Sequence, residues 1–150
     1  MGLDMWLYAE RHLSEFRENE KALAEEVGKH ANMPGRIAVI RSEILYWRKM
    51  NAIHSWFVKN YQDGVDDCRD CRVPIDAITK LRDVCRQVLA ERERAAELLP
   101  TSQGFFFGSL GYDEWYFNDV EYTEKVLTET LDFLSKEDDV WCDFVYSSSW

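Results

Sequence analysis

The segment from Leu98 to Asp119, LLPTSQGFFFGSLGYDEWYFND, constrains the fold of this chain more than any other stretch. Seven aromatic side chains fall within the thirteen residues from Phe105 to Phe117, and Gly104, Gly108 and Gly111 interrupt them. The segment fits neither helical nor strand periodicity, and glycine permits backbone conformations that other residues resist. We therefore expect an irregular aromatic loop that either plugs a core or lines a pocket.

Length and composition predict one folded domain. A chain of 150 residues with 46% hydrophobic and 14% aromatic residues can bury a single core and is unlike a disordered tail. Its 28 acidic and 18 basic residues give a net charge of −10, which opposes direct binding to nucleic acid and to anionic membranes. No signal peptide or membrane-length apolar run is present, and four cysteines without a secretory signal indicate a reduced, cytoplasmic protein.

Hydrophobic periodicity predicts an α+β fold. Alternation or β-branched and aromatic enrichment indicates strands at 2–9, at 37–47 with a bend near Ser42 and Glu43, at 72–73 and at 140–146. Helical spacing indicates helices at 13–28, 51–61, 74–98 and from 118 onward. We expect Asn51 to be an N-cap, and Asn118 with Glu121 to form a capping box. The expected architecture is a single α+β domain (1–150), with a small antiparallel or mixed sheet of three to four strands and helices mainly on one face.

The entry to the second predicted helix is a candidate anion site. Two cations, Arg48 and Lys49, precede the helix, and His54 lies one turn inside it. A helix N-terminus already favours an anion, and an arginine can hold a phosphate with two hydrogen bonds. The alternative is that both cations pair with surface carboxylates while His54 is a half-buried helix residue.

The aromatic loop is the second candidate. Tyrosine and tryptophan rings can stack on a nucleobase, which contributes about 1–3 kcal/mol per base. The alternative is that the phenylalanines Phe105–Phe107 and Phe117 only cover one end of the core. Together the two segments supply the candidate ligand-binding residues Tyr46, Trp47, Arg48, Lys49, Asn51, His54, Thr101, Ser102, Tyr112, Asp113, Trp115 and Tyr116.

The sequence predicts no metal, cofactor or catalytic motif. The Cys68–Cys71 pair lacks two further zinc ligands at a recognisable spacing, and the acidic segment 63–70 fails the pattern of a calcium-binding EF-hand loop. Nucleotide-binding glycine motifs and nucleophile motifs are absent from the sequence. Catalysis by His54 with Asp113 or Glu114 stays open if the fold brings these residues together.

Several short strings are distributed over the whole chain: MGLDMWLY, YWRKMNAIHSWFV, QDGVDDC, LLPTSQGFFFGS, YDEWYF and SSSW. In these strings the chain resembles a family of small accessory proteins of bacteriophages and prophages. The resemblance implies a phage accessory protein that acts in the cytoplasm of an infected bacterium. It brings no catalytic residues to this sequence.

Three hypotheses about function follow. The first is a non-enzymatic, anti-defence phage protein that sequesters a small nucleotide-like signal. The second is an acidic inhibitor whose segments 10–26, 63–70 and 137–143 occupy the nucleic-acid-binding groove of a host defence protein. The third is a small enzyme that uses His54 on a phosphorylated or nucleotide substrate. The six tryptophans are also compatible with a homo-oligomer formed through an aromatic patch.

Overall fold

The computed structural model describes residues 2–137 and 141–150. Its elements follow one another along the chain as β1 (Asp4–His12), α1 (Glu18–Ala31), β2 (Val39–Arg48), α2 (Asn51–Tyr61), β3 (Cys71–Val73), α3 (Ile75–Ala90), the 3-10 helix η1 (Arg92–Arg94), α4 (Ala95–Leu98), α5 (Glu114–Lys136) and β4 (Asp143–Ser149). The predicted α+β class is confirmed.

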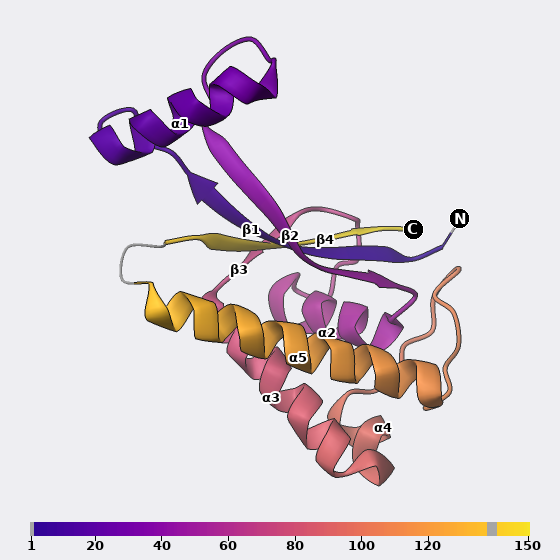
Figure 1. Cartoon of the computed structure of the whole chain (residues 1–150). Coiled ribbons are helices and arrows are strands. Elements are labelled where there is room, and N and C mark those ends of the chain that lie inside the picture. Colours follow the sequence, from indigo (N-terminus) through magenta and orange to yellow (C-terminus); the bar gives the residue numbers. More distant parts are fainter. Residues whose placement is uncertain (1, 138–140) are drawn as a thin grey trace.

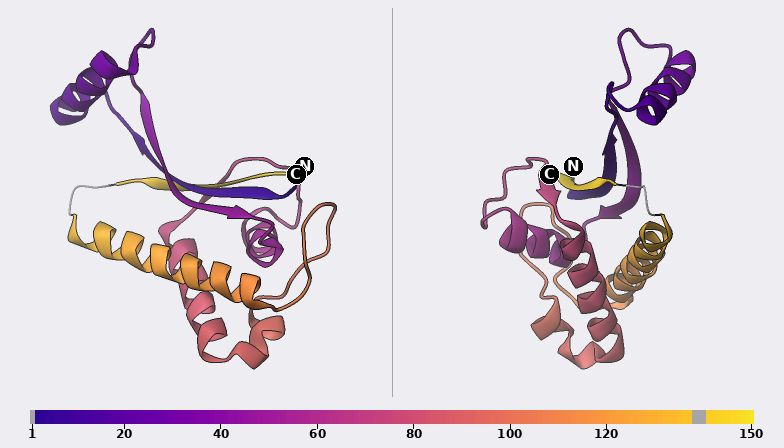
Figure 2. Two further views of the ribbon diagram at one scale, coloured as in Figure 1. Left: turned by 45° about the vertical axis from the view of Figure 1, so that its right-hand side comes forward. Right: turned by 90° about the vertical axis from the view of Figure 1, so that its left-hand side faces the viewer.

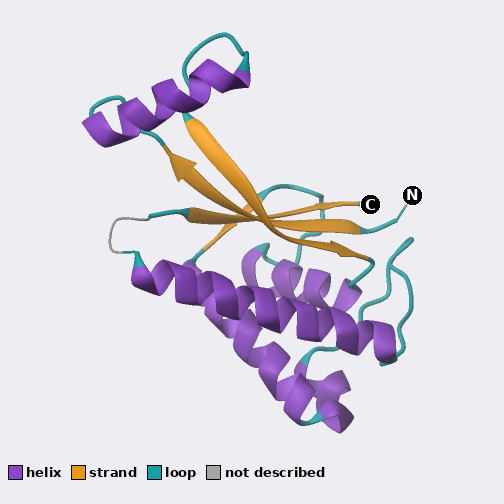
Figure 3. Cartoon of the chain, viewed as in Figure 1, coloured by secondary structure: helices purple, strands orange, loops and turns teal. Residues whose placement is uncertain are grey.

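The four described strands form one antiparallel sheet in the order β2-β1-β4-β3. Helices α2, α3 and α5 lie together below this sheet in Figure 1, and the same layering is visible in Figure 3. The covered face explains the alternation at the start of the chain, because Leu3, Met5 and Leu7 are buried. The strand order places β1 inside the sheet, between β2 and β4, and β2 at one edge.

Strands β1 and β2 extend beyond the rest of the sheet and carry α1 at their far end, which gives the projecting arm visible in Figure 2. The pairing register shifts between Leu7, opposite Leu45, and Tyr8, opposite Glu43. Ile44 is thus an extra residue in β2, and such a bulge bends a strand. The bulge lies beside the bend predicted at Ser42 and Glu43.

The first helix starts and ends later than predicted. Phe16 is 91% exposed and precedes the helix, because the Glu20 carboxylate accepts a hydrogen bond of 2.8 Å from the backbone N–H of Ser14 and holds this segment in a turn. Gly28 does not end the helix. Asn32 ends it in a left-handed conformation with φ 48°, a role that asparagine shares with glycine.

Two further helix boundaries were predicted wrongly. The helix after Pro74 ends at Ala90 and is followed by two short helical turns. The last helix begins at Glu114, since the Asp113 carboxylate caps it by accepting a hydrogen bond of 3.1 Å from the N–H of Tyr116. The capping box predicted at Asn118 is wrong, because that residue lies inside α5.

The last strand, β4, begins at Asp143, whereas we expected it from Val140. Val140 lies outside the described residues. Within the described part of the chain, no helix combines the length and the apolar character needed to cross a membrane.

Candidate functional site

The end of β2 forms one side of the candidate site. The Lys49 N–H donates a hydrogen bond of 2.7 Å to the carbonyl oxygen of Leu3 in the chain segment just before β1. Because alternate residues bond across an antiparallel pair, the backbone N–H and C=O of Arg48 face away from β1, toward the open edge of the sheet. Lys49 itself has a φ of 60°, and this left-handed residue turns the chain into α2.

Asn51 fastens the aromatic loop to this turn. Its side-chain N–H groups donate to the carbonyl oxygens of Phe107 at 3.0 Å and Ser109 at 2.9 Å. Its side-chain oxygen accepts from the N–H of Ser102 at 2.9 Å. The predicted N-cap is therefore wrong: all three bonds of the Asn51 side chain go to the aromatic loop, and none goes to a helix N–H.

The loop backbone lies directly on Lys49. Gly108 has a φ of +88°, and a Cβ atom there would be 3.0 Å from the Cβ of Lys49. Both the conformation and the contact favour glycine at this position. The aromatic loop and the end of β2 are thus held together by backbone contact and by the Asn51 bonds.

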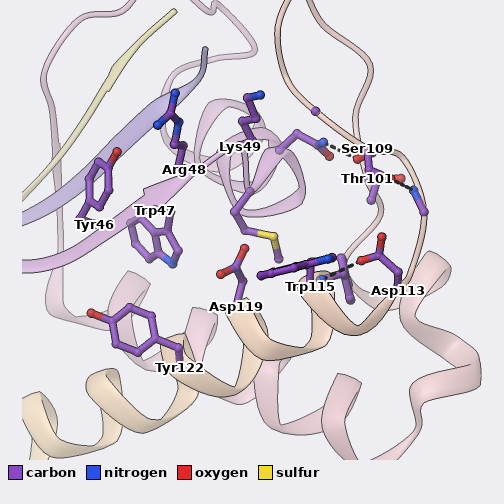
Figure 4. Close-up of a pocket in the computed structure, with 15 residues that line it drawn as sticks. Tyr46, Trp47, Arg48, Lys49, Thr101, Ser109, Asp113, Trp115, Asp119 and Tyr122 are labelled. Atoms are coloured by element: carbon purple, nitrogen blue, oxygen red, sulfur yellow. Dashed lines mark hydrogen bonds between the residues drawn. The ribbon is translucent and has the colours of Figure 1, made fainter. Parts of the chain in front are cut away.

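A cavity of about 430 Å³ opens between the end of β2, the aromatic loop and the first turns of α5 (Figure 4). Nine of the twelve candidate residues line it: Tyr46, Trp47, Arg48, Lys49, Asn51, Thr101, Asp113, Trp115 and Tyr116. The structure therefore brings together two segments that are about fifty residues apart in the sequence.

The other three candidates do not line the cavity. His54 is 1% exposed, and its two ring nitrogens are 2.6 Å from the Tyr146 hydroxyl and 2.9 Å from the Asp66 carboxylate. Placing His54 in the pocket was wrong, because the buried face of α2 carries its side chain into the core. Ser102 and Tyr112 stabilise the loop. The Ser102 N–H donates to the Asn51 side chain in α2, and the Tyr112 hydroxyl accepts from the Thr101 N–H at 3.1 Å.

The aromatic residues around the cavity differ in what they offer to a ligand. Trp47 is buried and donates its ring N–H to Thr123 at 2.7 Å, while the buried hydroxyl of Tyr116 donates to the Leu99 carbonyl at 2.8 Å. Both residues serve as walls. Trp115 is 80% exposed, so its ring is the surface on which a flat ligand can stack.

Six further lining residues were missed in the sequence: Met50, Gly108, Ser109, Gly111, Asp119 and Tyr122. Asp119 and Tyr122 follow Trp115 by four and seven positions, which places all three on one face of α5. Burial raises the pKa of the Asp119 carboxyl to about 6. Among residues 2–137 and 141–150, this carboxylate takes part in no hydrogen bond or ion pair, so it is free to accept from a ligand.

The cavity has two chemically different sides. In the described part of the chain, neither Arg48 nor Lys49 forms an ion pair, although Arg41, Arg72 and Arg86 do. In Figure 4 the charged ends of Arg48 and Lys49 are on the strand side and point away from α5, whereas the Asp119 carboxylate and the Trp115 ring rise from α5. The arrangement suits a ligand with an anionic part and a flat part that carries hydrogen-bond donors.

Replacing Asp119 with asparagine is expected to stabilise the protein by about 1 kcal/mol at neutral pH, after allowance for solvent screening of this partly exposed group. The pKa rises from 3.8 to about 6 on folding, so the stability cost of ionising Asp119 is absent below pH 3.8 and complete above about pH 6. Urea unfolding should show the gain at about pH 7.5 and little gain at about pH 4. Glu121→Gln, at an exposed site on the same helix, is the control. An equal gain at both pH values would argue against the burial cost.

A second cavity, of about 600 Å³, is lined by Arg11, His12, Leu13, Ser14, Arg17, Glu20 and Trp141. Its cations are partly neutralised, because Arg17 pairs with Glu20 at 3.3 Å. Trp141 is 69% exposed and gives this cavity an aromatic wall. It is the main alternative to the site at the end of β2.

Among the described residues, no group of three or more histidine, cysteine, aspartate or glutamate side chains is arranged to hold a metal ion. The Sγ of Cys71 donates to the backbone carbonyl of Tyr61 at 3.0 Å.

Comparison of the chain with protein-family models, with curated proteins and with solved structures finds no match. The cavity at the end of β2, which we call the β2–α5 pocket, is the candidate functional site.

Proposed function

We propose that this protein is a non-enzymatic binding protein that sequesters a small nucleotide-like ligand in the β2–α5 pocket. The observation that carries the proposal is a single cavity whose lining includes one exposed indole ring and two cations that form no ion pair among the described residues. Its volume of about 430 Å³ lies within the range of roughly 300–1,000 Å³ that is usual for small-molecule sites. In keeping with the phage resemblance, we place this activity in the cytoplasm of an infected bacterium, where it would blunt a defence signal.

The strand side of the pocket supports binding of phosphate. Arg48 and Lys49 contribute two positive charges, and the backbone N–H of Arg48 faces the open edge of the sheet. A ligand phosphate can therefore receive charge-assisted hydrogen bonds without displacing a protein carboxylate from either cation. Such contacts offset the net charge of −10 only at short range, so affinity should fall as salt is raised.

The helix side supports binding of a flat ring. Trp115 exposes its indole at the first turn of α5, where the Asp113 cap and packed neighbours hold the backbone. Because the backbone is held, only the two side-chain torsions of Trp115 need to be ordered when a base stacks on it. The pocket thus supports recognition of both ends of a nucleotide.

Calorimetric titration with nucleoside mono-, di- and triphosphates and cyclic nucleotides tests the proposal. At least one ligand should bind with micromolar affinity, and Trp115→Ala should weaken that binding by about 5- to 150-fold, the loss expected for one stacked base. The fold should be unaffected, because the side chain is exposed. The absence of binding by every nucleotide would refute the proposal.

Trp141→Ala is the matched control for this experiment. It removes an exposed tryptophan that lines the second cavity and not the β2–α5 pocket. Affinity should stay within a factor of about two, since the deleted ring contacts no part of the proposed site. Loss of binding in Trp141→Ala with normal binding in Trp115→Ala would move the site to the second cavity.

The projecting arm favours a second candidate function, inhibition of a host protein through acidic contacts. Helix α1 stands away from the sheet in Figure 2, and Glu18 and Glu25 are exposed on it. One predicted acidic contact is already neutralised within the molecule, because the buried Glu10 pairs with Arg41 and Arg72, and residues 138–140 of the predicted segment 137–143 lie outside the described residues. For this function, the affinity for a basic partner should fall steeply as salt is raised and should be unchanged in Arg48→Ala.

The enzyme hypothesis loses its candidate residue, because His54 does not line the pocket.

A further inference from the structure

The Asp119 carboxylate suggests which base the β2–α5 pocket would take. Trp115 and Asp119 are one helical turn apart on the same face of α5, and Figure 4 shows the carboxylate beside the rim of the indole ring. A base stacked on this indole would therefore meet Asp119 with its edge and not with its face.

An ionised carboxylate only accepts hydrogen bonds, so the base edge that it meets must carry donors. Guanine presents two adjacent donors, its ring N1–H and its exocyclic amine, which match the two oxygens of a carboxylate. Adenine presents one amine beside a ring nitrogen that is an acceptor, and this nitrogen would repel the carboxylate. Among the residues described, the second carboxylate of the pocket, Asp113, is already used as the cap of α5.

Building on the proposed function, we propose that the β2–α5 pocket selects a guanine base, with Trp115 stacked on its face and Asp119 accepting from its N1–H and exocyclic amine. The phosphates of the same nucleotide then extend toward the end of β2, which Arg48 and Lys49 line, and the two side chains would turn their charged ends toward them. An organic cation fits less well, because these two cations line the same cavity and would repel it.

Titration with guanosine, adenosine and xanthosine monophosphates tests the base preference, because these probes share their ribose and phosphate. The native protein should bind the guanosine compound about 5- to 150-fold more tightly than the adenosine compound, the range for one bidentate base contact. The preference should weaken as the pH falls below about 6, where Asp119 gains a proton.

Asp119→Asn supplies a readout that a merely structural role would not move. The asparagine oxygen can accept from N1–H while its amide donates to the C2 carbonyl of xanthine, so the variant should prefer the xanthosine compound to the guanosine one. A general loss of affinity without this reversal would overturn the assignment of Asp119. Glu121→Gln should bind all three probes as the native protein does.

The two proposals fail in distinguishable ways. Equal binding of the three monophosphates, lost in Trp115→Ala, would overturn the guanine assignment and leave the nucleotide-binding function standing. Binding of none of them at millimolar concentration, together with binding of choline, would overturn both. Tighter binding of the adenosine compound would likewise overturn the guanine assignment alone.

Discussion

Replacing Asn51 with alanine is expected to release the aromatic loop and to abolish measurable nucleotide binding. The substitution removes three hydrogen bonds, to Phe107, Ser109 and Ser102, and the Phe107 bond is buried. Leaving such groups without partners should cost about 2–4 kcal/mol of unfolding free energy. Urea unfolding measures the loss of stability, and calorimetry measures the loss of binding.

Hydrogen exchange shows directly whether the loop is released. The Ser102 N–H donates to the Asn51 side chain, so its exchange should become much faster in Asn51→Ala. Asn60→Ala is the matched control, because Asn60 lies exposed in the same helix and, within the described part of the chain, its side chain bonds only to the carbonyl of Trp56 one turn before it. Unchanged exchange at Ser102 and normal binding in Asn51→Ala would show that the loop is held by other contacts.

Replacing His54 with alanine is expected to destabilise the fold by about 3–5 kcal/mol, a cost typical of deleting a buried ring and leaving a buried hydroxyl unpaired. The His54 ring packs edge-on against Phe107 at 5.1 Å between ring centres, and it bonds the buried Tyr146 hydroxyl. Thermal or urea unfolding measures the cost. His30→Ala, at an exposed site on α1, should stay within about 0.5 kcal/mol of the native protein.

Binding separates a structural role of His54 from a functional one. Where His54→Ala is still folded, its nucleotide affinity should stay within about threefold of the native value, because the side chain does not line the pocket. A variant of native stability that had lost ligand binding or a turnover activity would restore His54 to the site.

The sequence predicts the sheet well because burial of one face imposes a strict alternation. Leu3, Met5 and Leu7 alternate with half-exposed residues, and this pattern alone identifies β1. Helix starts are harder to predict, because Asp113 and Asn118 obey the same local capping preference. Because Asn118 was predicted to be the cap, Trp115 was assigned to the loop before the helix. The helical spacing that puts Trp115, Asp119 and Tyr122 on one face of α5 could then not be recognised.

The sequence also predicted that the end of β2 and the aromatic loop meet, as they do around the cavity, while two of their residues, Asn51 and His54, were misread. Cations and aromatic rings are recognisable by type, so Arg48, Lys49 and Trp115 could be singled out. Asn51 was taken for a helix cap, since an amide side chain suits a cap and a distant loop equally well. Its partners lie more than fifty residues away, and no local pattern encodes them.

Nuclear magnetic resonance of the indole N–H signals of the six tryptophans, recorded while guanosine monophosphate is added, tests directly whether a guanine nucleotide binds at Trp115. Trp115→Phe assigns the Trp115 signal. We expect a saturable shift of that signal, with the signals of Trp141 and Trp56, which do not line the β2–α5 pocket, changing little. A shift confined to Trp141, or no shift of Trp115 at millimolar nucleotide, would contradict this expectation.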